Sequence, residues 1–127
     1  MRDIVVTTPK NEMKNAAREA EEARRTPGTK YFRRFSRSVP PDLGPGTRIF
    51  YVEDGYVRGF AVVERVVTGS MLCSTTGRQW SPGTYAVMAA SSWKWIRPLP
   101  MTGFRNWKYF TLQYEIVGDW LSPKPTP

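Results

Sequence analysis

Residues 47–67 read TRIFYVEDGYVRGFAVVERVV and contain the two strand-like runs that decide the fold. The runs are separated by Asp54 and Gly55, and an Asp-Gly pair favours a type I′ turn, whose twist suits two antiparallel strands. The sequence therefore predicts a tight β-hairpin over Arg48 to Arg65.

The turn also predicts the register of this hairpin, if Asp54 and Gly55 are its only loop residues. The expected pairs are Val52 with Val57, Tyr51 with Arg58, Phe50 with Gly59, Ile49 with Phe60 and Arg48 with Ala61. Both faces of the ribbon are then largely apolar, and an isolated two-stranded ribbon is marginal in water. One face needs a barrel interior and the other a helix or a ligand. We expect a small, curved, mostly antiparallel β-barrel of five or six strands.

Length and composition restrict the class of protein. The chain has 127 residues, enough for one domain with its own core. Its longest apolar runs fall well short of the roughly 20 residues that a membrane span needs. A single cysteine, Cys73, and the lack of histidine exclude an internal disulfide, a cysteine-rich zinc site and the usual histidine-activated nucleophiles. We expect an intracellular, cytoplasmic protein with no metal, cofactor or membrane partner.

The segments on either side of the hairpin supply the other predicted elements. A short strand over residues 3–8 precedes a helix that begins at Thr8 or Asn11 and ends near Arg25, with an alanine stripe for packing on the sheet. We predict a polar loop over residues 68–83 and strands over residues 84–90, 93–96 and 109–117. The fold class is therefore α/β, more closely α+β. Residues 1–117 form one domain, and residues 118–127 form a proline-rich flexible tail.

Positive charge is concentrated in residues 24–37 and 65–108, two segments that contain no acidic residue. The formal net charge of the chain is +8. Basic segments interleaved with aromatic residues are typical of surfaces that neutralise phosphates and stack bases, so we expect nucleic acid, RNA or DNA, as the partner. The residues expected to contact its backbone are Lys30, Arg33, Arg34, Arg37, Lys94, Arg97, Arg105 and Lys108.

Trp80 is the tryptophan that we assign to base contact, because it lies late in the predicted polar loop. Trp93 and Trp95 share one face of a short predicted strand, so at least one of them packs inward. Trp93 and Trp107 are the next candidates for stacking. Packing in the core is the alternative for each of these side chains, since tryptophans of small barrels usually lie there.

Several motifs occur in a characteristic order along the chain. They are the strand and helix at residues 4–25, an aromatic segment at residues 30–35, the hairpin motif at residues 46–61, the tryptophan loop at Trp80 and the run Trp95-Ile96-Arg97-Pro98-Leu99-Pro100. This order resembles the PUA-like superfamily of small barrels, which contains the ASCH, EVE and YTH domains. The resemblance covers about residues 3–117 and implies a small curved barrel with one N-terminal helix packed on it.

The resemblance also implies a function and a set of site residues. Domains of this superfamily read nucleic acids, and several hold one modified, extruded base between aromatic walls beside the first helix. By this resemblance Trp80 is the loop tryptophan of the pocket, Tyr31 or Phe32 is the aromatic wall that follows the helix, and Asn11 is a polar residue at the rim.

A second motif implies a catalytic alternative. Residues 28–30, Gly-Thr-Lys, resemble the start of the ASCH motif Gly-x-Lys-x-x-Glu-x-Arg, but Arg33 stands where the motif has glutamate and Phe35 where it has arginine. Some ASCH proteins are amidohydrolases of acylated nucleobases that use a lysine, a threonine and a glutamate. The resemblance assigns only Lys30 and Glu64 to such a site in this chain.

The sequence thus favours a nucleic-acid-binding module that reads a single base, plain or modified, over an enzyme, because basic residues are abundant and catalytic residue types are few. An ASCH-type amidohydrolase acting on acylated nucleobases or nucleosides is the first alternative. A protein-binding inhibitor or adaptor is the second, and it alone predicts no affinity for nucleic acid at any salt concentration.

Overall fold

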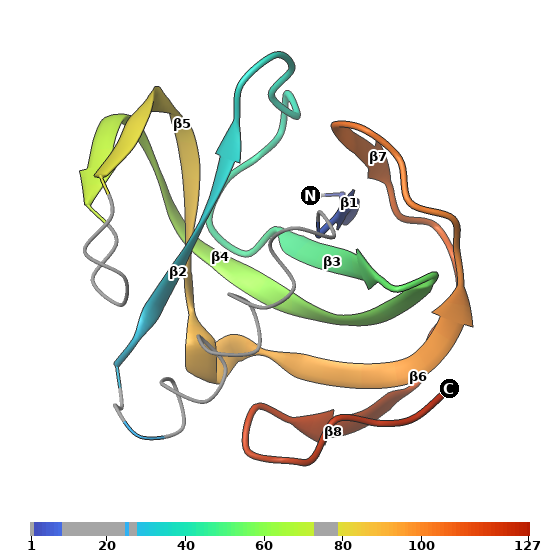
Figure 1. Cartoon of the computed structure of the whole chain (residues 1–127). Helices are drawn as coiled ribbons and strands as arrows, with labels where there is room; N and C mark the ends of the chain where they lie inside the picture. The colour runs from blue at the N-terminus through green and yellow to red at the C-terminus, as the bar shows by residue number, and fades with distance from the viewer. Residues whose placement is uncertain (1, 9–24, 26–27, 73–78) are drawn as a thin grey trace.

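The structure is a computed structural model that describes residues 2–8, 25, 28–72 and 79–127, without the side chains of residues 70–72 and 79–81 (Figure 1). This part of the chain is mostly β. Its elements are β1 (Ile4–Thr7), β2 (Lys30–Phe35), β3 (Arg48–Glu53), β4 (Tyr56–Leu72), β5 (Gln79–Ala89), the 3-10 turn η2 (Ala90–Ser92), β6 (Lys94–Pro100), β7 (Trp107–Tyr109) and β8 (Ile116–Asp119). The predicted N-terminal helix begins at Thr8 or Asn11 and ends near Arg25, and residues 9–24 of this stretch lie outside the described ranges.

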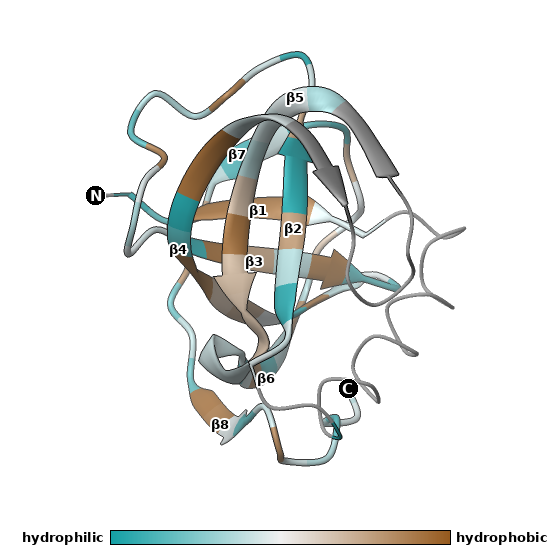
Figure 2. Ribbon diagram, turned by 90° about the vertical axis from the view of Figure 1, so that its left-hand side faces the viewer, coloured by the Kyte–Doolittle hydropathy of each residue, from teal (hydrophilic) through white to brown (hydrophobic). Residues whose placement is uncertain are grey.

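The strands form one curled, mixed sheet with the order β2-β5-β4-β3-β1-β7, while β6 pairs with β4 and carries β8. β1 and β3 are parallel, and the other pairs are antiparallel. The curl brings the two ends of the strand order together, because Phe35 of β2 packs in one cluster with Ile4 of β1 and Trp107 of β7. Hydrophobic segments run along β1, β3 and β5 in Figure 2.

The predicted number of strands, five or six, is too low, since the sheet has eight. β7 and β8 contain three and four residues, which is too short for an alternating pattern to be recognised. β2 is rich in basic residues and was predicted only as an aromatic segment. The parallel pairing of β1 with β3 also escaped prediction, because a sequence pattern does not show which distant strands become neighbours.

The hairpin of β3 and β4 is buried on both faces. On one face, Ile49 and Ala61 join the cluster that fills the interior of the curl. On the other face, Phe50 and Phe60 join a second cluster. Residues 104–114 cover this second face through Phe104, Phe110 and Tyr114. The expectation of two covered faces is confirmed, but the outer cover is an irregular stretch of the same chain and not the expected helix or ligand.

The turn has the predicted type I′ form, with φ angles of 52° at Asp54 and 82° at Gly55. The predicted register holds only for the pairs nearest the turn. Arg58 then forms a β-bulge, so every later pair is displaced by one residue. The observed pairs are Glu53 with Tyr56, Val52 with Val57, Tyr51 with Gly59, Phe50 with Phe60, Ile49 with Ala61 and Arg48 with Val62.

Residues 68–83, predicted to form a polar loop, belong largely to strands. β4 continues to Leu72 and β5 begins at Gln79, and the two strands pair along this length. The hydrogen bonds of a β-ladder join backbone groups, so a polar ribbon can form without the apolar alternation that a sequence search detects. Trp80 consequently lies in a strand, opposite Met71.

The C-terminal strands also differ from the prediction. β6 begins at Lys94 and runs through Pro98 to Pro100, although the prolines were expected to end it. Pro98 has no pairing partner on β4 or β8, so its missing N–H breaks no ladder bond. The predicted strand over residues 109–117 is interrupted, because β7 ends at Tyr109 and β8 begins at Ile116. The residues between them cover the hairpin instead of pairing.

The expected domain boundary after residue 117 falls inside β8. Residues beyond β8 make hydrogen bonds to the sheet, including one from Trp95 Nε1 to the carbonyl oxygen of Ser122, at 3.2 Å. The flexibility of residues 118–127 stays a prediction.

Gly59→Ala should destabilise the fold by about 1–3 kcal/mol, the usual cost of overpacking a core. A Cβ at this position would lie 2.5 Å from Cζ2 of Trp93 and would also collide with the carbonyl oxygen of Lys94, and the latter is backbone that cannot move aside. Denaturant unfolding monitored by circular dichroism measures the change. Gly44→Ala is the matched control, because a Cβ at Gly44 meets open space. Equal stability of the two variants would contradict the close approach at Gly59.

Candidate nucleic-acid interface

Strand β2 carries most of the predicted site residues and divides them between two faces. Side chains alternate along a strand, so Tyr31, Arg33 and Phe35 point to one face and Phe32 and Arg34 to the other. Phe35 lies in the interior cluster, and Tyr31 packs against it. Tyr31 and Phe32 therefore cannot both face one pocket.

Arg33 crosses from β2 toward β1 on the interior face. Its Nη1 donates a long hydrogen bond of 3.4 Å to the carbonyl oxygen of Thr7. Its Nε is buried and has no hydrogen-bond partner in the described structure. Arg33 thus joins β2 to the last residue of β1 and is poorly placed to contact a phosphate at the outer surface.

Arg34 lies on the opposite face and is exposed, and its Nη2 donates a 2.9 Å hydrogen bond to the carbonyl oxygen of Pro82. The side chain rests on Gly83, where a Cβ would stand 2.7 Å from Arg34 Nε. The missing side chain of Gly83 leaves room for the guanidinium, so Arg34 is held in one place while its charge stays free of any described carboxylate.

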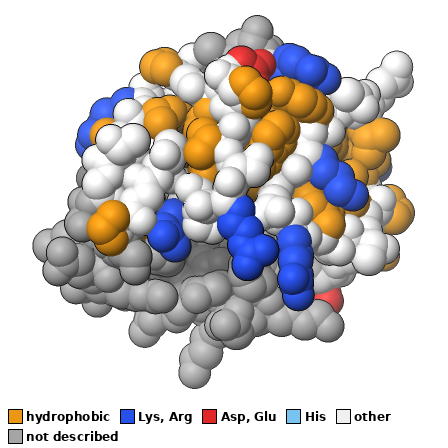
Figure 3. Space-filling model, turned by 90° about the horizontal axis from the view of Figure 1, so that it is seen from above, with side chains coloured by type: hydrophobic (Ala, Val, Ile, Leu, Met, Phe, Trp, Pro, Cys, Tyr) orange, Lys and Arg blue, Asp and Glu red, His pale blue; other side chains and the backbone are white. Residues whose placement is uncertain are grey.

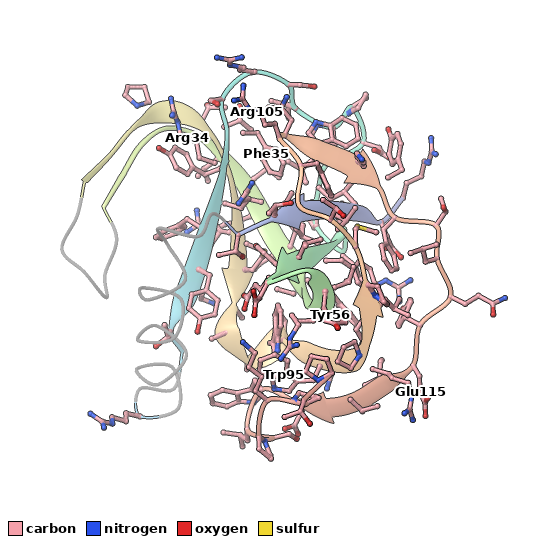
Figure 4. The ribbon with its side chains drawn as sticks, turned by 45° about the vertical axis from the view of Figure 1, so that its right-hand side comes forward. Arg34, Phe35, Tyr56, Trp95, Arg105 and Glu115 are labelled. Carbon is pink, nitrogen blue, oxygen red and sulfur yellow. The ribbon has the colours of Figure 1, made fainter. Side chains whose placement is uncertain are left out.

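A side-chain contact brings together two basic loops that are far apart in sequence. Trp107 Nε1 donates a hydrogen bond of 3.2 Å to Oγ of Ser38. Arg37 directly precedes Ser38, and Arg105 lies two residues before Trp107, so both exposed arginines belong to this junction. Figure 4 places Arg105 and Arg34 at the same end of the molecule. Seen from that end, Lys and Arg side chains surround a group of hydrophobic side chains, with acidic ones only at the margin (Figure 3).

Lys108 follows Trp107 in β7 and adds a fourth cation, whose side chain points to the opposite face of the strand. Its Nζ lies 4.4 Å from the ring centroid of Phe104, close enough for a cation–π contact. The backbone N–H of Phe104 donates to Oγ1 of Thr7 at 3.0 Å, which fixes the loop. We call the set Arg34, Arg37, Arg105 and Lys108 the basic surface; within the described structure none of the four forms an ion pair with a carboxylate.

Three other residues that were expected to contact the nucleic-acid backbone lie beside acidic residues of the protein. Lys30 Nζ is 2.7 Å from Glu64 Oε1, and Arg97 Nε is 2.9 Å from Glu115 Oε2. Lys94 stands opposite Asp119 in the pairing of β6 with β8. Figure 4 shows Glu115 at the end of the molecule away from Arg34 and Arg105. Lys30, Lys94 and Arg97 therefore have partially neutralised charges and are not part of the basic surface.

Only part of the predicted base pocket falls on described residues. Asn11 lies outside the described residues, as does the side chain of Trp80. Phe32 pairs with Val87 on β5, seven residues from Trp80 on the same strand. At about 3.3 Å per residue this separation is roughly 23 Å, several times the span of a stacked base. The assignment of the pocket residues stays a prediction, but this register does not let Trp80 and Phe32 hold one base between them.

The remaining tryptophans have different surroundings. Trp93 is 5.8 Å from Tyr51 and 5.2 Å from Trp95, measured between ring centroids, and its Nε1 is buried with no described partner. Trp107 is half-buried and meets Tyr109 edge-to-face at 5.0 Å. Of these, Trp107 is the aromatic side chain that lies at the basic surface. From the sequence, Trp107 was only a reserve candidate for base stacking. Its contact with Ser38, 69 residues away, is not visible in a local sequence pattern.

Candidate metal clusters and membrane-spanning helices are absent from the described part of the chain. Carboxylate side chains do not gather there in any group of three or more that could hold a metal ion. No helix in the same part is long and apolar enough to cross a membrane.

Comparison with solved structures supports the fold, whereas no family model and no curated protein matches the chain. Two solved structures do match, a Tyr→Phe mutant and a Ser→Ala mutant of the ZmASCH protein from Zymomonas mobilis. Both superpose with a TM-score of 0.51, at 15% and 17% identity, over 87% of this chain and 91% and 89% of those chains. The predicted resemblance of the fold to that of an ASCH protein is thereby confirmed.

The ion pair of Lys30 and Glu64 should lower the pKa of the Glu64 carboxyl below the usual value of glutamate. The hydrogen bond from Lys30 is the main cause, and the positive charges of Lys30 and Arg65 add to it. A depressed pKa means that the pair stabilises the fold above the ordinary pKa of glutamate and loses this effect as the pH falls through the lowered value. Carboxyl-detected NMR titration measures the pKa of Glu64.

Lys30→Met should raise the pKa of Glu64 toward its usual value. Glu115 is an internal control, because its pKa is lowered by the hydrogen bond from Arg97 and should not respond. A Glu64 pKa that stays the same in Lys30→Met would show that the two side chains are not paired in solution.

Proposed function

We propose that this chain is a nucleic-acid-binding module that grips the phosphate backbone with the basic surface. The observation that carries the proposal is the meeting of the two acid-free segments of the sequence. β2 pairs with β5 over six residue pairs, and Ser38 accepts the hydrogen bond of Trp107. Cations that are scattered along the sequence therefore gather around one end of the sheet, without carboxylates to neutralise them in the described structure.

The chemistry of the basic surface suits phosphate better than an acidic protein partner. Three of its four members are arginines, whose planar guanidinium presents several donors to phosphate oxygens. The contacts that hold Arg34 and Lys108 use a carbonyl oxygen and an aromatic ring, so their charges remain available. Half-buried Trp107 follows Arg105 by two residues, donates a hydrogen bond to Ser38 beside Arg37, and offers a ring for base stacking, which is worth about 1–3 kcal/mol per base. We assign base contact first to Trp107.

Arg37→Ala and Arg105→Ala should each weaken binding to every oligonucleotide tested and should make the slope of log K against log salt shallower by about one unit. Each variant removes one exposed cation that releases counterions from the phosphate backbone. Fluorescence anisotropy with labelled single- and double-stranded RNA and DNA at several salt concentrations measures both quantities.

Arg97→Ala is the matched control for these variants. Arg97 is equally an exposed arginine on the sheet, but it is paired with Glu115 at the other end of the molecule. Its removal should leave the slope unchanged. Trp107→Ala should lower the affinity without changing the slope, because stacking releases no counterion. An identical loss in all the arginine variants would indicate a diffuse charge effect and would contradict the basic surface.

A second candidate function is supported by one contact. The structure brings Lys30 and Glu64 within 2.7 Å, and these are the two residues that the ASCH resemblance assigned to an amidohydrolase of acylated nucleobases. Arg33 occupies the motif position of glutamate, and its guanidinium points toward Thr7. The catalytic set is therefore incomplete on the described residues, which is why binding is the preferred function.

Incubation of the protein with N4-acetylcytidine should release no acetate beyond the uncatalysed rate if the chain is a binding module only. Chromatographic detection of free cytidine provides the measurement. Release of acetate that is abolished by Lys30→Ala and retained by Lys94→Ala would instead establish the amidohydrolase. Lys94 is a suitable comparison because it is another strand lysine near a carboxylate.

A further inference from the structure

Arg58 is the charged residue that the sheet buries most deeply in the described structure, with 6% of its surface exposed. It forms the bulge of the hairpin, and the pairing of β4 with β6 shifts register at the same residue. A bulge on both sides of a strand redirects a side chain away from the alternation of its neighbours. The long apolar run of β4 thus presents one arginine at a defined place.

The partners of Arg58 do not neutralise its charge. Its Nη2 donates a 2.8 Å hydrogen bond to the carbonyl oxygen of Pro125, and its Nε is buried without a described partner. None of the ion pairs in the described structure includes it. A buried cation is costly unless an anion or a full set of acceptors faces it, so the present cover leaves this guanidinium undersatisfied.

The cover is the C-terminal segment, residues 120–127, which we call the strap. It is held at three places: Ser122 accepts from Trp95 Nε1, Lys124 lies 3.5 Å from Glu53, and Pro125 accepts from Arg58. Its side chains at positions 123, 124, 126 and 127 are exposed. A pocket of about 460 Å³ remains between the strap and the sheet, lined by Tyr56, Arg97, Pro98, Pro100, Val117, Pro125, Thr126 and Pro127.

We propose that the strap is displaceable and covers a second phosphate-binding site, in which Arg58 is the cation. The carbonyl oxygens of Pro125 and Ser122 occupy the positions that phosphate oxygens take on Arg58 and Trp95 once the strap leaves. Tyr56 lines the pocket under the strap, and Trp95, in the lower part of Figure 4, contacts the strap through Ser122. This inference rests on the proposed function, since it takes the phosphate to belong to a nucleic acid, and the strap then limits affinity by competing with it.

Two single substitutions in the full chain test the strap through charges of opposite sign. Glu53→Gln and Lys124→Ala each break the same ion pair, but one removes a negative charge and the other a positive one. If the strap competes with the ligand, both should raise the affinity for a single-stranded oligonucleotide by about two- to fivefold, the effect expected for a partly exposed ion pair. If only long-range charge matters, Glu53→Gln should strengthen binding and Lys124→Ala should weaken it, which would overturn the proposal.

A double-mutant cycle tests the role of Arg58. A chain that ends at Ser122 lacks Lys124 and Pro125, so Arg58 is uncovered while Ser122 can still accept from Trp95. This shortened chain should bind the oligonucleotide about fivefold more tightly than the full chain, although it carries one positive charge less. Arg58→Gln should cancel this gain in the shortened chain and have little effect in the full chain, where the strap covers the site. Arg58→Lys retains the charge and should keep part of the gain. If the shortened chain still binds more tightly when it carries Arg58→Gln, Arg58 is not the cation of the site.

Binding by the full chain tests the proposed function, whereas the change on shortening the chain tests the strap. If the full chain binds oligonucleotides but shortening it changes nothing, the strap proposal alone is wrong. If the full chain binds none, titration of the shortened chain with inorganic phosphate, followed by tryptophan fluorescence, still decides whether Arg58 forms an anion site. A response that Arg58→Gln abolishes supports the site, and no response overturns it. If shortening unfolds the chain, as a thermal melt would show, the comparison of Glu53→Gln with Lys124→Ala decides.

Discussion

Burial of the β3–β4 hairpin on both faces is the constraint on which the rest of the structure depends. The ring of Phe50 shows it, because it stacks on Phe110 with centroids 3.9 Å apart and lies 5.0 Å from Phe60. The interior of the curl covers only one face of the ribbon, so the chain has to return over the other face after β6. Side chains hold this return: Tyr114 accepts a 2.7 Å hydrogen bond from Arg48, whose Nε also lies 3.1 Å from Asp3.

The placement of carboxylates determines where positive charge remains available. Acids at positions 3, 53, 64 and 115 each face a lysine or arginine, and all four of these pairs lie outside the junction of Ser38 with Trp107. The arginines near that junction have carbonyl oxygens as partners or none in the described structure. Exposed pairs of this kind add little to stability, so their main effect is on the electrostatic field of the surface.

Local rules predicted this hairpin well as far as the first bulge. The Asp-Gly turn and the two pairs next to it follow from the preferences of a few adjacent residues. One residue further, Arg58 leaves the ladder, and a side chain that seemed to face Tyr51 lies under the strap. The signal available in the sequence was a lone arginine within an apolar strand. It marked an unusual position but did not identify the partner, which lies 67 residues away.

The sequence by itself determined the hairpin, the apolar nature of both its faces, the two acid-free segments and the resemblance to PUA-like domains, because each depends on residues that are close together along the chain. Only the tertiary structure decided which cations share a surface, which are paired with acids, and that Tyr31 and Phe32 face opposite ways. Those outcomes depend on strand register and on contacts between distant segments, such as Ser38 with Trp107 and Lys30 with Glu64. A shift of one residue in register exchanges the faces of a strand, and no local pattern records that choice.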